Sequence, residues 1–531
     1  MLFTSYGFLA FAAVFLLLYY TVPKKLQWSL LLAASYIFYF IAGPEFLPYI
    51  IATTATVFLS ALLIERNAVK QSEFIKEHKE ELTKEQKKEY KDKQKRKRLT
   101  VFVLCLLANL GILAVVKYAD FFVSNINGVV NAFGGEGNLS FISLAVPLGI
   151  SFYTFQSIGY LTDVYRGTVK AERNIFKFAL FVSFFPQLIQ GPIGRYGALS
   201  ETLYSPHKFD TKTVAYGLER VLWGYFKKMV IADRILVAVS TMIKAPAEYN
   251  GAYSLLIMLF YTIQLYADFT GGIDITIGLA EAMGIKMSEN FIRPYFSKSL
   301  KEYWRRWHIS MCSWFREYLF YPVSVSKPMQ KITKFSKKLL GEKVGKRFPL
   351  YISTAIVWFA TGIWHGASWN FIVWGMCNWI VLMVSEEFEP LYKKFHEKFP
   401  RVGKTFAYKL LCVGRTFALV CALNLFDCYR SIADTGRVFF SLFYAKNWNI
   451  FVDGALLEVG LTVTDYVILA CGIALMIIVS LLQRKESVRD IISRRPYPAR
   501  FVIWYGLFLI ILLMGAYGIG YDASQFIYNQ F

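Results

Sequence analysis

Apolar runs about as long as a membrane-crossing helix recur along the whole chain, and they constrain its fold more than any other feature. A helix needs about 20 apolar residues to cross a bilayer. Because 56% of the 531 residues are hydrophobic and only 18% are charged, a soluble enzyme, a disordered chain and a fibrous protein are excluded. We therefore expect an all-α polytopic membrane protein that forms a single membrane domain over residues 1–531. The apolar runs lie at 5–22, 27–42, 46–64, 100–118, 141–160, 216–243, 252–284, 350–366, 371–386, 405–427, 464–482 and 501–520.

The charge balance is basic, with 59 Lys and Arg against 37 Asp and Glu and a net charge of +22. In a soluble protein such a balance would suggest a nucleic-acid partner, but basic loops between membrane spans follow from the positive-inside rule. No nucleic-acid partner is therefore expected. The seven cysteines show no CxxC or Cys/His spacing, which predicts neither a disulfide framework nor a metal site.

The distribution of basic residues predicts the topology of the chain. The segment 65–98 holds 13 basic and 8 acidic residues, and Lys24 and Lys25 lie two spans earlier on the same side. Both are placed in the cytoplasm. Alternation then leaves the N-terminus and the loop 119–140, which has no Lys or Arg, outside. The first run lacks a charged start and a cleavage site, so we expect a retained span rather than a signal peptide.

Three further segments refine this topology. The basic turn 484–500 is expected in the cytoplasm, which leaves the C-terminal tail 521–531 outside. The stretch 65–98 is expected to form one long charged helix or a helical hairpin, which is either solvated or docks anionic lipid headgroups or a partner. The run 175–195 is apolar but is broken by two prolines and two glycines. It is expected to be a re-entrant segment shielded by other helices.

Two of the five histidines lie next to apolar runs and are candidates for chemistry. His308 lies in YWRRWHISMCSWF and His365 in TGIWHGASWN, and each directly follows a tryptophan. An ionisable group at membrane depth is costly and tends to persist where it lines a wet cavity. Imidazole is suited to remove a proton from a hydroxyl near neutral pH, and a wall of Trp364, Trp369 and Trp374 would keep competing water from His365.

Each of these candidates has a structural alternative. A neutral His365 could pin the turn between two helices by hydrogen-bonding a carbonyl, with Gly366 supplying backbone freedom. His308 could belong to an amphipathic segment at the membrane interface. Cys312 lies one helical turn after His308, where a thiol and a base share a face. Cysteine is nevertheless common in membrane helices as a small hydrophobic residue.

Four motifs, in the same order along the chain, resemble the membrane-bound O-acyltransferase (MBOAT) superfamily. They are similar to its bacterial branch, which contains the AlgI, PatB and DltB proteins, and the opening MLFTSYGFLAFAAVFLLLYYTVP resembles that branch as well. Recognisable motifs run from the first residue to about residue 390 and return at the C-terminus. The four motifs are PLGISFYTFQSIGYLTDVYRG, FFPQLIQGPIGRY, DFTGGIDITIGLAEAMGIKMSENFIRPYFSKSLKEYWRRWHISMCSWFREYLFYP and TGIWHGASWNFIVWG.

The resemblance implies a fold and a catalytic pair. The family fold is a bundle of roughly 11 to 14 transmembrane helices with re-entrant segments around a central funnel or tunnel. His365 matches the family's catalytic histidine, and His308 matches a second position where members carry His or Asn. His365 would act as general base on an acceptor hydroxyl, and His308 would orient or stabilise the developing oxyanion. Trp364, Trp307 and Asn370, beside these motifs, are expected to bind substrate.

The resemblance also implies a reaction and its partners. The chain would be an O-acyltransferase of a bacterial cytoplasmic membrane, in contact with membrane lipid, that transfers an acyl group, expected to be acetyl, for O-acetylation of a cell-surface or secreted polysaccharide. The donor would be a cytoplasmic thioester, either acetyl-CoA or an acyl carrier protein, with no bound cofactor or metal. An extracellular SGNH-type transferase would make the final ester. Residues that could hold a donor phosphate, or could simply follow the positive-inside rule, are Arg305, Arg306, Lys298 and Lys301.

The last six residues, FIYNQF, resemble a C-terminal signature in which a tyrosine is proposed to receive the acyl group and carry it outward. Tyr528 matches that tyrosine, whereas Asn529 differs from the phenylalanine that is commoner at its position. A phenol on an external tail could reach the outer mouth of a tunnel. The alternative is an aromatic anchor at the membrane interface.

Two other functions stay open at the level of the sequence. D-Alanyl transfer to teichoic acid would use a carrier-protein thioester rather than acetyl-CoA. A transporter or flippase would use Asp268 and Asp274, which flank a glycine pair in an apolar run, as an ion or proton site. These carboxylates could instead cap a broken helix or pair with a nearby arginine. The chain shows no repeat of fixed period, which argues against a transporter.

Overall fold

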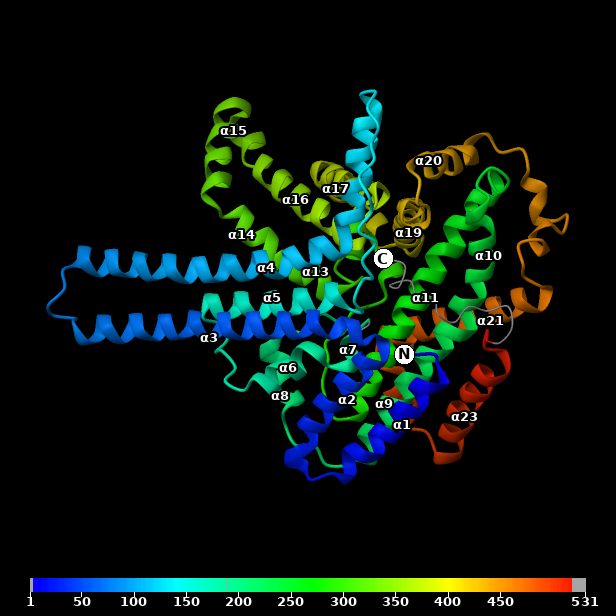
Figure 1. Ribbon diagram of the computed structural model, residues 1–531. Helices are drawn as coiled ribbons and strands as arrows, with labels where there is room; N and C mark the ends of the chain where they lie inside the picture. Colours follow the sequence, from blue (N-terminus) through cyan, green and yellow to red (C-terminus); the bar gives the residue numbers. More distant parts are fainter. Residues whose placement is uncertain (1–2, 189, 518–531) are drawn as a thin grey trace. The chain divides into compact units, whose positions relative to one another are not determined.

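The computed structural model describes residues 3–188 and 190–517, and in these ranges it contains helices and no strand (Figure 1). The all-α fold class expected from the apolar runs is confirmed. The chain divides into two compact units, which are described separately below. One comprises Met1–Ala215 and Leu279–Met287, and the other comprises Tyr216–Gly278 and Ser288–Phe531. The single domain expected for the whole chain stays a prediction.

The first unit contains the long antiparallel helices α3 and α4, which lie side by side in Figure 1, and α3 also packs against α5 and α6. These helices form because each carries a long run without proline in its interior, and their apolar faces bury against one another. The helices of this unit are α1 (Tyr6–Thr21), α2 (Gln27–Ala42), α3 (Leu47–Glu77), α4 (Lys84–Ala132), α5 (Ile150–Arg166), α6 (Ile175–Ser183), α7 (Phe185–Leu188) and α8 (Tyr196–Leu203).

The charged stretch 65–98 folds as a helical hairpin, one of the two forms expected. At the start of α4 the Thr83 hydroxyl accepts a hydrogen bond from the Gln86 amide at 3.2 Å, and the Gln86 side chain accepts one from the Thr83 amide at 2.9 Å. This capping box satisfies two backbone donors that the helix cannot. Arg98 on α4 donates to Gln71 on α3 at 2.7 Å, which ties the two helices together.

Two expected boundaries in this unit are wrong. The sequence predicts a loop at 119–140, but α4 continues to Ala132, because no proline or positive-φ residue interrupts it before Gly134. The sequence predicts a span at 141–160, but α5 begins only after Gly149, whose φ is +69°. Its left-handed backbone favours glycine and breaks the apolar run before a full span can form.

The apolar stretch 175–195 is broken and buried, as the sequence predicts. The short helices α6 and α7 meet near Pro186, and residues 178–188 are all buried. Inside this packing Gln187 donates to the Gln156 side chain at 2.6 Å, so polar groups meet partners rather than hydrocarbon. Irregular backbone of this kind cannot face lipid, which fits a shielded segment. Its re-entrant course through a membrane stays a prediction.

The second unit holds the histidine motifs and is built mainly from helix pairs. The helices α16 and α17 pack against each other, and α17 also packs against α19. The helices of this unit are α9 (Thr211–Tyr225), the π-helical turn η3 (Phe226–Ala232), α10 (Asp233–Lys244), α11 (Ala252–Ala282), α12 (Leu300–Tyr303), α13 (Ile309–Phe315), the π-helical turn η5 (Arg316–Phe320), α14 (Tyr321–Ser324), α15 (Lys327–Gly345), α16 (Phe348–His365), α17 (Trp369–Glu387), α18 (Glu389–Lys398), α19 (Phe406–Cys428), α20 (Ile432–Ser441), α21 (Val463–Leu482), α22 (Val488–Ser493) and α23 (Tyr497–Met514).

Seven helices in the described part of the chain are long and apolar enough to cross a membrane, or eight when α17 and α18, bent by 43°, count as one span. This is fewer than the apolar runs because some runs are interrupted. The run 216–243 divides into α9, η3 and α10 and carries Lys227 and Lys228 in its middle. The multi-pass membrane fold is confirmed, whereas the number of spans stays a prediction.

Candidate functional site

His365 is the last residue of α16, at the turn that leads into α17. The two helices approach so closely that both need glycine at the crossing. A Cβ added to Gly362 would lie 2.5 Å from the carbonyl oxygen of Phe371, and one added to Gly375 would overlap the carbonyl oxygen of Trp358. This close pairing fixes the turn at which the imidazole is presented.

Gly366 follows His365 and is required for a different reason from the one expected. Its φ is −175°, an extended backbone that any residue adopts, so backbone freedom is not needed there. A Cβ at this position would instead clash with the ring of Phe371. That ring stacks beside His365 with 6.2 Å between ring centroids. Gly366 therefore makes room for an aromatic neighbour of the imidazole.

The imidazole of His365 lies beside two buried tryptophans. The distance between ring centroids is 4.6 Å to Trp374 and 5.2 Å to Trp364. Trp369 is 53% exposed, so its place in the expected wall of three tryptophans stays a prediction. His365 itself is half-buried. Its ring is therefore held by aromatic packing without being sealed inside it.

His308 is buried, at 1% exposure, immediately before α13. Its backbone is left-handed, with φ 45°, an uncommon conformation for a residue with a Cβ. Its ring lies 4.9 Å from the ring of Phe269 and 5.8 Å from that of Trp364. The surrounding segment is two short helices joined by a tight turn rather than one amphipathic helix. The ring of His308 thus belongs to the protein interior.

Asn290 holds His308 in place, although the sequence analysis does not single it out. The Asn290 side-chain oxygen lies 3.3 Å from Nδ1 of His308 and accepts hydrogen bonds from the Ser310 amide at 3.0 Å and hydroxyl at 2.9 Å. The Asn290 carbonyl accepts a hydrogen bond from the Ile309 amide at 3.0 Å. One fully buried side chain therefore organises the start of α13. Its burial and its partners, 18 residues away, are visible only in the fold.

The structure brings the two candidate histidines together. Trp364 packs against both imidazole rings, with 5.8 Å between ring centroids to His308 and 5.2 Å to His365. Two imidazoles, one half-buried and one buried, can hold and move a proton in a site with little water. In the described ranges no group of three or more His, Cys, Asp or Glu side chains could hold a metal ion.

The four basic candidates for donor binding fall into two kinds. Arg306 pairs with Glu302 at 2.5 Å, and Lys301 pairs with Glu386 at 3.0 Å. Arg305 and Lys298 are exposed, and the described residues place no ion pair on either of their side chains. Of the four candidates, only Arg305 and Lys298 therefore have a charge that no described acidic side chain pairs with, and that could bind a ligand.

Two other predicted binding residues, and the cysteine, make packing contacts. Trp307 is 5% exposed within an aromatic cluster, and its carbonyl accepts a hydrogen bond from the Cys312 thiol at 3.6 Å. The Asn370 amide donates to the carbonyl of Tyr429 at 2.7 Å and to the hydroxyl of Thr435 at 3.1 Å. These contacts stabilise the segments that carry the two histidines. Tyr528 lies outside the described residues.

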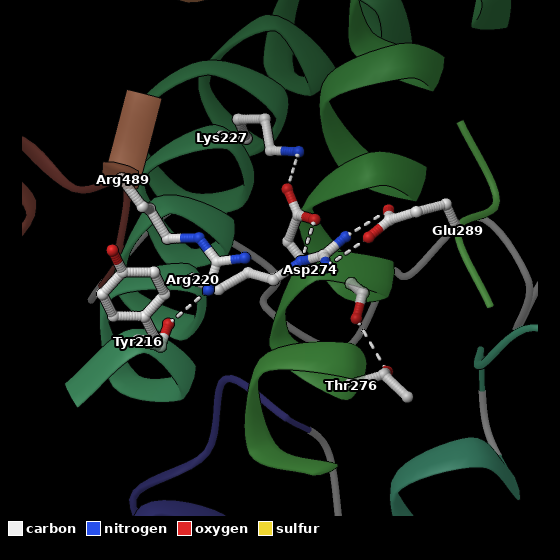
Figure 2. Close-up of polar contacts among 8 residues, drawn as sticks. Tyr216, Arg220, Lys227, Asp274, Thr276, Glu289 and Arg489 are labelled. Carbon is white, nitrogen blue, oxygen red and sulfur yellow. Dashed lines mark hydrogen bonds and ion pairs between the residues drawn. The ribbon is translucent and has the colours of Figure 1, made fainter. Parts of the chain in front are cut away.

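The two aspartates of the transporter hypothesis are engaged in ion pairs. Asp274 receives hydrogen bonds from Arg220 at 2.9 Å and Lys227 at 2.6 Å (Figure 2), so the expected pairing with a nearby arginine is confirmed. Asp268 pairs with Lys228 at 2.6 Å. The helix α11 runs through the glycine pair unbroken, so capping of a broken helix is wrong. Neutralised carboxylates argue against an ion site.

Glycines bring α9 and α11 close enough for these ion pairs to form. A Cβ added to Gly224 would lie 2.6 Å from the carbonyl oxygen of Gly271, and one added to Gly278 would lie 2.6 Å from that of Gly217. On each helix the two glycines are seven residues apart, which places them on one face. Close approach through small residues is a common way for membrane helices to pack.

Comparison with known proteins identifies a family for the chain. Residues 169–336 match the membrane-bound O-acyltransferase family. The chain is 35% identical over 377 residues to the probable alginate O-acetylase AlgI of Azotobacter vinelandii, and this alignment covers 71% of the chain and 66% of that relative. The chain thus matches just under two thirds of that relative's length.

Two further relatives extend the similarity. The probable alginate O-acetylase AlgI of Pseudomonas syringae pv. tomato is 31% identical over 502 residues, which cover 94% of the chain and 86% of the relative. The peptidoglycan O-acetyltransferase of Helicobacter pylori is 31% identical over 326 residues, which cover 56% of the chain and 58% of the relative. The chain therefore belongs to the membrane-bound O-acyltransferase family.

Proposed function

We propose that this protein is a membrane O-acyltransferase that moves an acetyl group from a cytoplasmic thioester donor across the membrane, for O-acetylation of a cell-surface or secreted polysaccharide. The observation that carries the proposal is the half-buried His365 beside the buried His308, in a chain of this family. The names of the relatives support acetyl as the transferred group, because they are probable alginate O-acetylases and a peptidoglycan O-acetyltransferase.

His365 is the general base of the proposed reaction. Its imidazole takes the proton from an acceptor hydroxyl while that oxygen attacks the thioester carbonyl carbon. The carbon–sulfur bond then breaks, the thiolate takes the proton back from His365, and an acetyl ester is left on the acceptor. The buried tryptophans on either side of the ring limit hydrolysis of the thioester by water.

His308 acts on the acceptor or on the oxyanion according to its protonation. A neutral ring whose Nδ1 donates to the Asn290 side-chain oxygen presents Nε2 as an acceptor, which orients a hydroxyl. A protonated ring donates from both nitrogens and stabilises a developing oxyanion instead. The hydrogen bond to Asn290 fixes the ring plane in either case.

Donor and acceptor reach this site from opposite faces in the proposal. Arg305 and Lys298, which are exposed, are the preferred contacts for a phosphate of coenzyme A or of a carrier protein. On the other face Tyr528 receives the acetyl group as a phenyl ester and passes it to an extracellular SGNH-type transferase. The protein lies in a bacterial cytoplasmic membrane with both termini outside and the α3–α4 hairpin in the cytoplasm.

The proposal is tested by mass spectrometry of the purified full chain after incubation with acetyl-CoA. His365→Ala should lower acetyl transfer to Tyr528 by about 100-fold or more, since a general base contributes at least that factor. The matched control is His396→Ala, because His396 is exposed and, among the described residues, its ring has one hydrogen bond, with the carbonyl of Tyr392 at 2.7 Å. The control should transfer at the wild-type rate.

Other outcomes decide between the alternatives. Wild-type transfer in the His365→Ala variant contradicts the catalytic assignment. Transfer from a D-alanyl carrier-protein thioester, with none from acetyl-CoA, overturns the acetyl group and favours teichoic acid D-alanylation. Acetyl transfer to a polysaccharide that is unchanged in Tyr528→Phe overturns the tyrosine carrier alone.

A further inference from the structure

A cavity of about 850 Å³ lies in the second unit, apart from the histidines. It is enclosed by α9, α11, α21, α22 and α23, and among the described residues neither His308 nor His365 lines it. The volume is typical of a site for a small organic ligand. The segment 289–293 forms part of its wall, while Asn290 in the same segment bonds His308.

One part of the cavity is apolar and lies between two membrane helices. Residues 475–482 of α21 and 503–510 of α23 contribute its aliphatic lining. Each stretch rises about 10 Å along its helix, or roughly a third of the hydrocarbon thickness of a bilayer. On α23 the lining positions 503, 506, 507 and 510 share one face. The apolar part therefore extends into the membrane from the end where α21 and α23 are joined.

The other part of the cavity is positively charged. Five basic and three acidic side chains line it. Arg220 binds Glu289 through two hydrogen bonds of 2.7 and 2.6 Å and also contacts Asp274, which Lys227 binds as well (Figure 2). These two bases are thus already matched by two acids.

Three further arginines and Glu219 line the same part of the cavity. Arg489 stacks over the ring of Tyr216 at 5.2 Å and donates one hydrogen bond to its carbonyl at 2.7 Å (Figure 2). Arg293 is half-buried and Arg495 is exposed, and the described residues offer neither guanidinium a hydrogen bond or an ion pair. A guanidinium has five donors and suits a phosphate, which it can bind through two of them.

The backbone and the charge of Arg293 also indicate a ligand. Its φ of 47° makes it one of three non-glycine residues with positive φ in the described ranges, and such conformations cluster at functional sites. Burial lowers the pKa of Arg293, and the positive charges of Arg306 and Arg484 lower it further. Cations gathered around a cavity are stabilised when an anion enters it.

We propose that this cavity binds an anionic phospholipid, with the headgroup phosphate on Arg293 and Arg495 and an acyl chain between α21 and α23. The apolar lining gives the chain a place that a soluble phosphate would leave empty. The surplus positive charge selects an anionic over a zwitterionic headgroup. Part of the lining, including Arg495, lies between the candidate spans α21 and α23, which is where a headgroup is expected.

The test is native mass spectrometry of the full chain in mild detergent, with lipids of identical acyl chains. Phosphatidylglycerol should bind at least tenfold more tightly than phosphatidylcholine. The double variant Arg293→Gln, Arg495→Gln should lose about tenfold in phosphatidylglycerol affinity. Arg494→Gln is the matched control, because Arg494 is exposed and pairs with Glu486 outside the cavity. It should bind like the wild type.

A second variant tests the acyl chain without touching a charge. Gly506 lines the cavity, and a Cβ added there meets no atom within 4 Å. Gly506→Leu should therefore fill the acyl part of the cavity and weaken phosphatidylglycerol binding at least fivefold. Gly414 on α19 is equally open and does not line the cavity, so Gly414→Leu serves as its control.

The remaining outcomes overturn the proposal. Equal binding of the two lipids, or phosphatidylglycerol binding unchanged in both test variants, excludes a lipid site in this cavity. Binding of acetyl-CoA that requires Arg293, with no lipid selectivity, assigns the cavity to a soluble phosphate ligand instead. Acetyl transfer is measured in neither arm, so the lipid site and the acyltransferase proposal fail independently.

Discussion

The buried amide of Asn290 is the residue on which the orientation of His308 depends. Its side-chain oxygen meets Nδ1 of His308 and both donors of Ser310, at a point where the His308 backbone is left-handed. A strained backbone persists only where its surroundings over-determine it. Asn290 is therefore a positioning residue for the proposed reaction rather than a group that touches substrate.

Replacement of this amide by a carboxylate should alter the pH dependence of the reaction. In Asn290→Asp a negative charge at Nδ1 favours the protonated form of His308 and raises its pKa. If the neutral ring is the active form, the acidic limb of the pH–activity profile should lie at a higher pH in the variant than in the wild type. The kcat at neutral pH should then fall. The measurement is the pH profile of acetyl transfer by the full chain.

Asn290→Ala separates this effect from simple destabilisation. It removes the hydrogen bonds without adding a charge, and it should cost about 1 to 3 kcal/mol of stability. The acidic limb of the pH–activity profile of Asn290→Ala should not move to higher pH. A limb that stays at the wild-type pH in Asn290→Asp would falsify the positioning role.

At the scale of single residues, the sequence predicts the chemistry of a side chain better than it predicts the neighbours of that side chain in the fold. His308 and His365 stand out because a base beside a tryptophan in an apolar run is costly, and the fold does bring them together. Asn290 is missed because its partners begin 18 residues later. Trp369 is exposed whereas Trp374 is buried, since five residues of helix rotate one side chain by about 140° from the other.

The crossing of α9 and α11 is the element on which the buried ion pairs depend. Gly278→Leu should force the helices apart, because even a Cβ there would lie 2.6 Å from the carbonyl oxygen of Gly217. Overpacking of this kind costs about 1 to 3 kcal/mol. The variant should therefore show a lower melting temperature in detergent. Gly414→Leu, in open space on α19, should melt at the wild-type temperature or above it.

The helices also show where hydrophobicity alone misleads. The run 216–243 is apolar enough to suggest one span, yet Lys227 and Lys228 fall in a π-helical turn that faces the carboxylates of α11. Pairing with acids on a neighbouring helix makes such charges tolerable, and a single helix cannot reveal its neighbour. By contrast, the charged hairpin of α3 and α4 is predicted well, because its capping residues and its charge pattern are local.

At the scale of the whole molecule, the length of α4 constrains how the chain can cross the membrane. Its 49 residues extend about 74 Å, more than twice the hydrocarbon thickness of about 30 Å. The helix must therefore leave the membrane at one end or at both. The charged N-terminal part of α4 and the segment after Ala132 are then expected on opposite faces.

This arrangement is testable with a protease site inserted into the full chain. A site in the α3–α4 turn, at residues 78–83, should be cut only by a protease in the cytoplasm. The same site placed at 134–140, after α4, should be cut only by protease added outside intact cells. The reverse pattern would invert the proposed orientation, and cleavage of both sites from one face would exclude it.

The fold class and the family could be predicted from the sequence because both depend on local patterns, namely long apolar runs and short ordered motifs. The number of spans and the course of 141–160 could not, since a positive-φ glycine and a pair of charges divide runs that hydrophobicity joins. The cavity under α21 and α23 left no pattern in the sequence at all. Its lining comes from two stretches, 219–293 and 475–510, that are far apart in the sequence.

Asn290, which holds the imidazole of His308, lies three positions before Arg293, which lines the cavity proposed to bind lipid. A headgroup that settles on that guanidinium would pull on the same short piece of backbone that positions the base. The rate of surface acetylation would then follow the phospholipid composition of the leaflet, so that a cell altering its envelope lipids would also adjust the decoration of its outer polymers.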